Sequence, residues 1–186
     1  DADNFARLAR LGNERLSAFI LDSIELCSPA EVMVLDDSPE HVNLTRKKAI
    51  ETGEEQLLAT KGHTVHWDGM ADQGRDREVT KYLVPKGETF SKAINQMERM
   101  AGLDEVRGLL AGAMAGRTMI VRFMTLGPNN SAFSVPCVEC TDSWYVSHSL
   151  DLLYRGGYGQ FARMAGKGEF FAILHSCGKV DERMVS

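Results

Sequence analysis

The sequence predicts an α/β or α+β fold, in which helices flank a mixed sheet. Segments with apolar residues at helical spacing interleave along the chain with short apolar runs that are typical of strands. The apolar fraction of 44% and the charged fraction of 25% are those of a soluble globular protein. The 186 residues suffice for one full-sized domain, so residues 1–186 are predicted to form a single domain.

The first part of the chain predicts a helix, a strand and a second helix. Asp3 or Asn4 is expected to cap the first helix. The apolar stripe of this helix consists of Phe5, Leu8, Leu11, Leu16, Phe19 and Ile20. The run Glu31–Leu35 predicts a short buried strand. The second helix begins at Ser38-Pro39, a cap residue followed by proline, and ends at about Thr52-Gly53, where the glycine can adopt a left-handed conformation.

The middle of the chain predicts a strand, a functional loop and another strand between Lys61 and Val84. Alternating residues at Thr64–Trp67 and the run Thr80–Val84 form the two strands, and the stretch between them is rich in Gly, Asp and Arg. Thr89 is expected to cap a further helix. One face of that helix carries Phe90, Ile94, Met97 and Met100.

The last third predicts a strand pair, a helix and a final strand. Thr118–Leu126 and Phe133–Cys140 are expected to pair across a Gly-Pro-Asn-Asn-Ser turn. A helix then begins at Asp142-Ser143 or at Ser147 and extends to about residue 161. Glu169–His175 is expected to form the last strand.

Charge and cysteine usage indicate a cytoplasmic protein that binds neither nucleic acid nor membrane. A net charge of -5 lacks the Lys and Arg surplus that phosphate binding needs. Asp1–Ala6 lacks the order of a signal peptide, and the small, apolar stretch Gly108–Gly116 is too short to span a bilayer. Four cysteines are too few for a disulfide scaffold in a chain of this length, which favours a reducing compartment.

Two pairs of residues have the spacing of metal ligands. Cys137 and Cys140 resemble half of a zinc site, but residues three apart on a strand point to opposite faces, so we interpret them as buried structural thiols. The same objection applies to His63 and His66, which we expect to pack or to form hydrogen bonds. Trp67 is expected to lie in the core or at a domain interface. The methionines are expected mostly in the core: Met97, Met100, Met114, Met119 and Met124.

Two glycine-containing stretches partly resemble the sequence motif of a phosphate-binding loop. Ser176–Lys179 reads Ser-Cys-Gly-Lys, but Val180 stands where a Mg²⁺-binding Ser or Thr would be needed. Ala111–Thr118 has Arg in place of the required Lys and is better interpreted as a tight turn that leads into a strand.

A long block of the sequence resembles a known enzyme family. Gly116–Pro128 (GRTMIVRFMTLGP) and Thr141–Val146 (TDSWYV) resemble the GRTMYVxPFxMGP…TDSPYV block of GTP-dependent phosphoenolpyruvate carboxykinases. The resemblance continues through Ser147–Arg155 and into Gly168–Ser176, which is similar to the family's GEF…LHS segment. The resemblance covers roughly residues 60–176, and it implies the fold of the amino-terminal domain of that family.

The resemblance assigns one substrate-binding residue. The family's arginine that grips the carboxylates of oxaloacetate and phosphoenolpyruvate matches Arg75. A planar guanidinium offers a carboxylate two parallel N–H donors, and Gly74 allows the backbone to approach closely. The chain departs from the family two residues later, where Arg77 replaces the glutamate of vertebrate-type members, and Glu78 matches that glutamate only with a shift of one residue.

The resemblance also implies an activity. The intact enzyme would convert oxaloacetate and GTP into phosphoenolpyruvate, GDP and carbon dioxide, with Mn²⁺ and Mg²⁺ as cofactors. The family's metal ligands, its phosphate-binding loop and its Tyr-Gly-Gly substrate loop match nothing in this chain. A carboxyl-terminal nucleotide- and metal-binding domain is therefore the expected partner. No cofactor and no catalytic residue are expected in residues 1–186, which alone should be inactive.

A second hypothesis is a stand-alone module that keeps the fold and binds an anion or a regulatory ligand without catalysis. In that case Arg75 would be a solvated loop arginine paired with Asp72 or Asp76. A sizeable apolar patch around the last strand would favour the enzyme fragment, because it would mark an interface with further protein.

Overall fold

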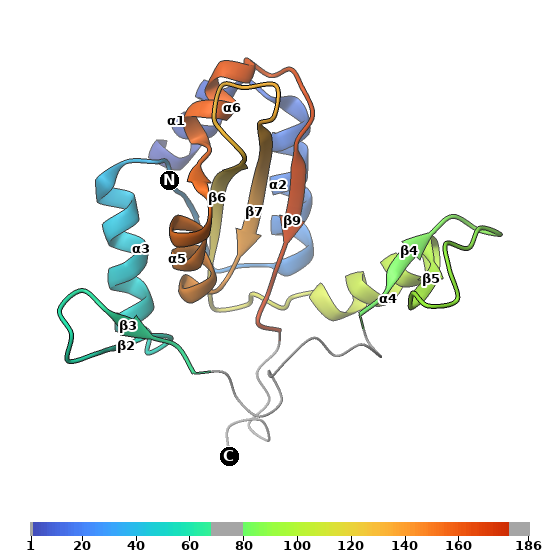
Figure 1. Ribbon diagram of the computed structural model, residues 1–186, viewed down its shortest axis with the longest axis horizontal. Helices are drawn as coiled ribbons and strands as arrows, with labels where there is room; N and C mark the ends of the chain where they lie inside the picture. The colour runs from blue at the N-terminus through green and yellow to red at the C-terminus, as the bar shows by residue number, and fades with distance from the viewer. Residues whose placement is uncertain (1, 68–79, 179–186) are drawn as a thin grey trace.

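The computed structural model describes residues 2–67 and 80–178, and its centre is a mixed sheet (Figure 1). The strand order is β1-β6-β7-β9, and β8 pairs with β6. The strands are β1 Glu31–Val34, β6 Thr118–Leu126, β7 Val135–Thr141, β8 Arg155–Gly156 and β9 Phe171–Leu174. Strand β1 is parallel to β6, β7 is antiparallel to β6, and β9 is parallel to β7, which confirms the predicted mixed sheet.

Helices cover both faces of the sheet, and each face has its own core. The helices are α1 Ala2–Leu11, α2 Glu14–Cys27, α3 Pro39–Glu51, α5 Trp144–Leu153 and α6 Tyr158–Met164. The main core lies under α1, α2 and α6, where Ile20 and Phe161 pack with Val121 and Val138 of the sheet. A smaller core lies under α3 and α5 and contains Leu35, Ala49, Ile120 and Trp144.

Two small units flank the main sheet. Strands β2 Gln56–Leu57 and β3 Thr64–Val65 form an antiparallel hairpin below α3 (Figure 1). Strands β4 Tyr82–Val84 and β5 Gln96–Glu98 are parallel and contact α4 Arg99–Leu110, and this unit projects from the other side of the molecule. Within the described ranges, no helix is long and apolar enough to cross a bilayer.

The predicted first helix is wrong as a single element, because the chain turns between α1 and α2. Gly12 has a φ of 55°, which ends α1 in the left-handed conformation that glycine tolerates. Asn13 caps α2 by accepting a hydrogen bond from the Leu16 amide at 3.0 Å. Asn4 lies inside α1 rather than capping it, and Phe5 is exposed instead of lying on a buried stripe.

The helix predicted from Thr89 is also wrong. Helix α4 begins ten residues later at Arg99, and the Glu98 side chain caps it by accepting from the Met100 and Ala101 amides, both at 3.0 Å. Residues 96–98 instead pair with β4. The helical spacing of the apolar residues between Phe90 and Met100 was therefore misleading. Pairing with β4, which lies outside this segment, overrides the local preference for a helix.

The helix predicted to run to residue 161 is interrupted. Ser143 caps α5 as expected, but Arg155 and Gly156 leave the helix and pair with Thr125 and Met124 of β6 as strand β8. The backbone is so close here that a Cβ on Gly157 would lie 2.5 Å from the Met124 nitrogen. The chain then starts α6. A contact with the sheet, rather than helix propensity, decides this stretch.

Other predicted elements are confirmed. Ser38 caps α3 and Pro39 is its first residue, and Gly53 adopts a φ of 80° after its end. Strands β6 and β7 pair antiparallel with Met124 opposite Cys137. Residues 111–116 form the predicted turn before β6.

Candidate functional site

The predicted substrate arginine, Arg75, lies outside the described residues. The same is true of its neighbours Arg77 and Glu78 and of the acids that were considered as alternative partners. The role of Arg75 therefore stays a prediction. The described part of the site consists of the elements that precede and follow residues 68–79.

The hairpin that precedes residue 68 is fastened to the start of α5. The Glu54 carboxylate accepts hydrogen bonds from the Ser143 hydroxyl at 2.6 Å, the Trp144 amide at 3.1 Å and the Tyr145 amide at 2.9 Å. The amides at a helix start have no partner within the helix, and the helix dipole favours a negative charge there. Glu54 thus anchors the hairpin to the Thr141–Val146 part of the family-like block.

A ring contact adds to this anchor. The His66 ring stacks on Tyr145, with the ring centroids 3.6 Å apart and the planes 12° apart. His66 Nδ1 lies 2.6 Å from the backbone oxygen of Glu54, so this nitrogen carries the proton and donates it. His66 therefore forms hydrogen bonds, as expected, whereas His63 is exposed. Trp67 is exposed as well, which contradicts a place in the core of this domain.

We expect Glu54→Gln to destabilise the 186-residue chain by about 1–2 kcal/mol, because the amide loses the charge that binds three donors. Urea unfolding measures the change. Glu51→Gln is the matched control: Glu51 lies three residues earlier, at the end of α3, and pairs with Lys47 and Lys48 on the surface, so no measurable change is expected. Equal stability of the Glu54 variant and the parent would contradict the anchor.

A buried carboxylate, that of Asp142, joins three segments of the family-like block. Its side chain is fully buried and forms an ion pair with Arg117 at 2.8 Å. It also accepts hydrogen bonds from the Ser176 hydroxyl and the Cys177 amide, both at 2.9 Å. Arg117 additionally donates to the carbonyl of Gly178. The segments 116–118, 141–143 and 174–178, which are separate in the sequence, therefore meet at one end of the sheet.

His175 completes this cluster. Its Nδ1 lies 2.8 Å from the Thr141 hydroxyl. Burial lowers the pKa of His175, and the nearby Asp142 carboxylate opposes this effect only in part. The cluster thus fixes the path of the chain from β9 to Gly178. The Ser176 hydroxyl and the Cys177 amide both bind Asp142, whereas Lys179 and Val180 of the stretch that resembles a phosphate-binding loop lie outside the described residues.

The cysteines of β7 have the geometry that the sequence predicted. Cys140 lies in the main core, and Cys137 lies with Met124 and Leu150 on the opposite face. Burial raises the pKa of Cys137 to about 11 and that of Cys140 to about 12, so both are inert thiols. In the described ranges, 2–67 and 80–178, no three His, Cys, Asp or Glu side chains gather closely enough to hold a metal ion.

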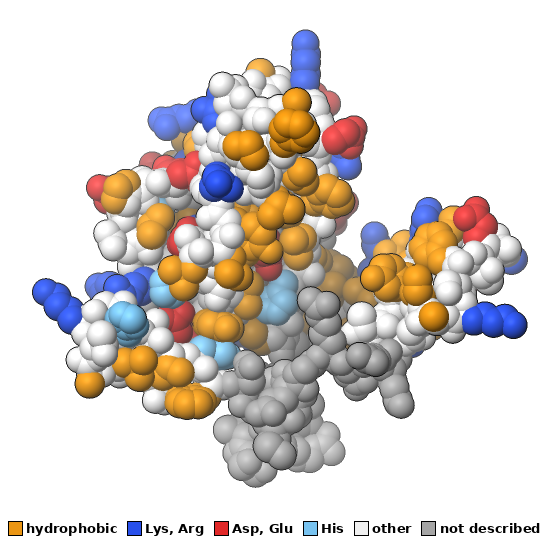
Figure 2. All heavy atoms as spheres, viewed as in Figure 1, with side chains coloured by type: hydrophobic (Ala, Val, Ile, Leu, Met, Phe, Trp, Pro, Cys, Tyr) orange, Lys and Arg blue, Asp and Glu red, His pale blue; other side chains and the backbone are white. Residues whose placement is uncertain are grey.

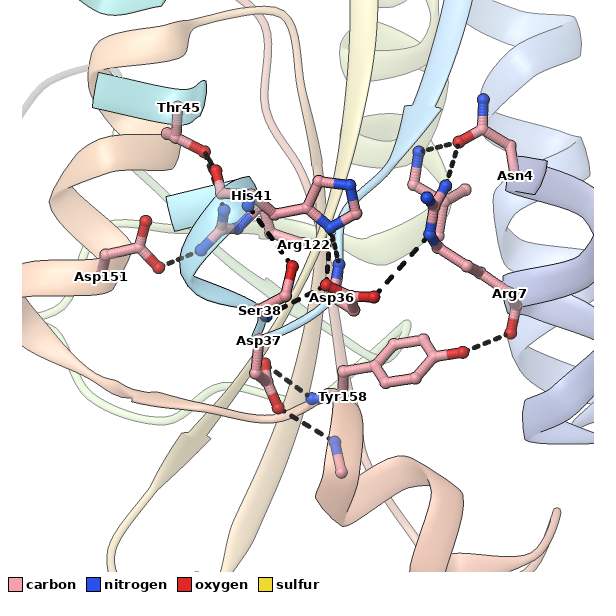
Figure 3. A network of polar contacts seen from close by, with 12 residues as sticks. Asn4, Arg7, Asp36, Asp37, Ser38, His41, Thr45, Arg122, Asp151 and Tyr158 are labelled. Atoms are coloured by element: carbon pink, nitrogen blue, oxygen red, sulfur yellow. Dashed lines mark hydrogen bonds and ion pairs between the residues drawn. The ribbon is translucent and has the colours of Figure 1, made fainter. Parts of the chain in front are cut away.

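A second polar network was missed by the sequence reasoning and lies at the far end of β1 (Figure 3). The Asn4 amide bridges β1 by donating to the Val32 carbonyl and accepting from the Val34 amide, both at 2.9 Å. Asp36 lies 2.6 Å from His41 and 3.8 Å from Arg7. Burial acts to raise the pKa of Asp36, but hydrogen bonds from Ser38 and His41 lower it.

The same network fastens α6. Asp37 accepts from the amides of Tyr158 at 3.1 Å and Gly159 at 3.0 Å, and the Tyr158 hydroxyl donates to the Arg7 carbonyl at 2.8 Å. Arg122 continues the network by binding Thr45 at 3.0 Å and Asp151 (Figure 3). These groups bind one another across α1, α3, α5 and α6, which indicates a structural role.

Comparisons with known proteins agree with the family-like block. Residues 18–185 match the family model of the phosphoenolpyruvate carboxykinase N-terminal domain. The chain is 44% identical over 186 residues to "Phosphoenolpyruvate carboxykinase [GTP]" of Thermococcus sibiricus and 42% identical over 186 residues to that of Pyrococcus furiosus. It is 28% identical over 173 residues to that of Treponema pallidum, 92% of this chain and 28% of the relative. In the first two matches the whole chain is covered, but only 30% of the relative. The chain therefore belongs to the phosphoenolpyruvate carboxykinase family and corresponds to its N-terminal domain.

Proposed function

We propose that this chain is the amino-terminal part of a GTP-dependent phosphoenolpyruvate carboxykinase, which converts oxaloacetate and GTP into phosphoenolpyruvate, GDP and carbon dioxide. The observation that carries the proposal is the match of residues 18–185 to the N-terminal domain of the family. The relatives that carry the name "Phosphoenolpyruvate carboxykinase [GTP]" support GTP as the nucleotide.

In this proposal the chain binds and orients the substrate. The Arg75 guanidinium holds a substrate carboxylate with two parallel hydrogen bonds, so that the enolate oxygen left by decarboxylation faces the γ-phosphate of GTP. The anchor formed by Glu54 and Tyr145 supports the role, because it fastens the chain before residue 68 to a rigid helix start.

Mn²⁺, Mg²⁺ and GTP bind elsewhere in the intact enzyme. Within residues 2–67 and 80–178, no three His, Cys, Asp or Glu side chains lie close enough together to hold a metal ion. Residues 1–186 alone would then be inactive, and the carboxyl-terminal part of the same enzyme would be their partner.

One observation favours the enzyme over a stand-alone ligand-binding module. The last strand, β9, exposes apolar side chains on the face that α5 leaves uncovered, with Phe171 66% and Ile173 41% exposed. Leu126, Leu152 and Leu153 are exposed on neighbouring elements. Such a patch supports an interface with further protein.

The full-length protein tests the proposal directly. With oxaloacetate, GTP and Mn²⁺ we expect formation of phosphoenolpyruvate and GDP, and we expect little product when ATP replaces GTP. Residues 1–186 alone should give no turnover in the same assay. A full-length protein that forms no phosphoenolpyruvate with either nucleotide would contradict the enzyme and leave the stand-alone module.

A further inference from the structure

The face of the sheet that carries α5 is covered only in part. In Figure 1, α5 lies against the lower part of β6, whereas β7 and β9 lie to the right of this helix. Figure 2 shows hydrophobic side chains gathered down this face. Phe171 and Ile173 of β9 pair in register with Cys137 and Glu139 of β7, so these four side chains share the face. A hollow of about 250 Å³ opens here. Its lining residues are Met124, Leu126, Val135, Cys137, Tyr154, Phe171, Ala172 and Ile173.

Strand β9 also has a free edge. It is the terminal strand of the order β1-β6-β7-β9, and none of the strands in the described ranges pairs with its outer side. Parallel strands such as β7 and β9 normally have both faces covered, because the connections between parallel strands place other elements over the sheet. An exposed apolar edge strand favours association with another segment. The uncovered face and the free edge are thus continuous.

The carboxylate of Glu139 determines which charge a binding partner of this surface should carry. Its side chain lies between Arg122 of β6 and Ile173 of β9 in the sheet register, and the residue is only 5% exposed. Arg122 is engaged by Thr45 and Asp151 instead. Of the residues that the structure describes, none forms a hydrogen bond or ion pair with the Glu139 carboxylate. The carboxylate oxygens keep slight contact with solvent, but burial of most of this residue without a partner is costly, so a donor from outside the described residues would relieve it.

We propose that the strip formed by Phe171, Ile173 and Glu139 binds the carboxyl-terminal part of the full-length enzyme, which supplies an apolar surface and one Lys or Arg side chain to Glu139. The inference rests on the proposed function, in which residues 1–186 are one part of a longer enzyme. The length of the relatives supports this occupant, because the chain spans about 30% of them.

The same chemistry disfavours a second copy of this chain as the occupant. A two-fold symmetric contact places the same surface patch on both partners. Two apolar strips would then meet, but each would bring a carboxylate rather than a cation. The charge of Glu139 therefore points to a different segment.

The sign of a stability change in the full-length enzyme tests the inference. If a cation binds Glu139, Glu139→Gln removes one partner of a buried ion pair, and the unfolding temperature should fall at pH 8, with a larger fall for Glu139→Lys. If no cation is present, burial keeps the pKa of Glu139 raised to about 7, and Glu139→Gln should raise the unfolding temperature at pH 8. A rise or no change would overturn the inference.

The sign follows from proton linkage. A carboxyl whose folded pKa is raised binds more protons in the folded state, so its contribution becomes unfavourable as pH rises from the ordinary value of 4.5 to about 7. Among the described residues, charged groups on elements packed against this face include Arg122, Asp151 and the pair of His148 and Glu55 at 2.6 Å. Glu139→Gln leaves them in place. Glu169→Gln is the control: its side chain is 90% exposed, so the unfolding temperature should not change.

A second measurement does not depend on a folded variant. Hydroxyl-radical labelling of the wild-type full-length enzyme should modify Phe171 far more slowly than in the unfolded enzyme, at protein concentrations where the enzyme is a monomer. Rapid modification of Phe171, or protection that appears only as copies associate, would overturn the inference. Carboxykinase activity of the wild-type enzyme is measured separately, so that failure of the docking inference is distinct from failure of the proposed function.

Discussion

Arg75→Ala in the full-length enzyme is expected to raise the KM for phosphoenolpyruvate and to lower kcat/KM by roughly 100-fold or more, which corresponds to about 2.7 kcal/mol of lost transition-state stabilisation. In the proposed role of Arg75, alanine removes two charge-assisted hydrogen bonds to the substrate carboxylate. Steady-state kinetics with phosphoenolpyruvate as the varied substrate measure the effect.

Two further variants separate charge from geometry. Arg75→Lys keeps the positive charge but loses the planar pair of donors, so we expect a loss of kcat/KM that lies between those of the parent and the alanine variant. Lys61→Ala removes an exposed positive charge from the preceding hairpin and should leave kcat/KM unchanged. If Arg75→Ala retained a near-normal kcat/KM, Arg75 would not be the carboxylate anchor.

Asp142→Ala is expected to destabilise the 186-residue chain by about 2–3 kcal/mol. The variant leaves the Arg117 guanidinium, the Ser176 hydroxyl and the Cys177 amide without their shared acceptor. The expected loss is below that of a fully buried pair because the Arg117 side chain keeps 30% exposure, which lets water replace part of the interaction. Guanidinium chloride unfolding measures the change.

An exposed ion pair of similar length serves as the control. Arg15 and Glu169 lie 2.7 Å apart, but their side chains are 61% and 90% exposed, so Glu169→Ala should have no measurable effect. The contrast tests whether burial, rather than the ion pair itself, gives Asp142 its importance. Similar stabilities of the Asp142 and Glu169 variants would show that the cluster at Asp142 does not hold the three segments together.

The two clusters give the family-like block a physical meaning. The Thr141–Val146 stretch supplies both the Asp142 carboxylate, which binds the segment after β9, and the start of α5, which binds Glu54. One short stretch thus positions the hairpin before residue 68 and the chain that leads to Gly178. This arrangement accounts for a block whose residues are mostly buried.

The sequence by itself determined the elements whose signals are local. Ser38-Pro39 marked the start of α3, the Gly-Pro-Asn-Asn-Ser turn after Leu126 marked the β6–β7 pair, and the spacing of Cys137 and Cys140 placed them on opposite faces. Each signal depends on residues within a few positions of one another, because caps, turns and strand alternation are short-range effects. The family-like block also determined the family.

Only the tertiary structure decided the rest. Glu54 reaches the start of α5 across about 90 residues, and Arg117 meets Gly178 across 61 residues. Pairing with β4 and β6 likewise turned residues 96–98 and 155–156 into strands against their local pattern. Such contacts depend on which segments the fold brings together, and no pattern within a single segment encodes the partner. The lone carboxylate of Glu139 became visible in the same way, once its strand neighbours and their partners were in place.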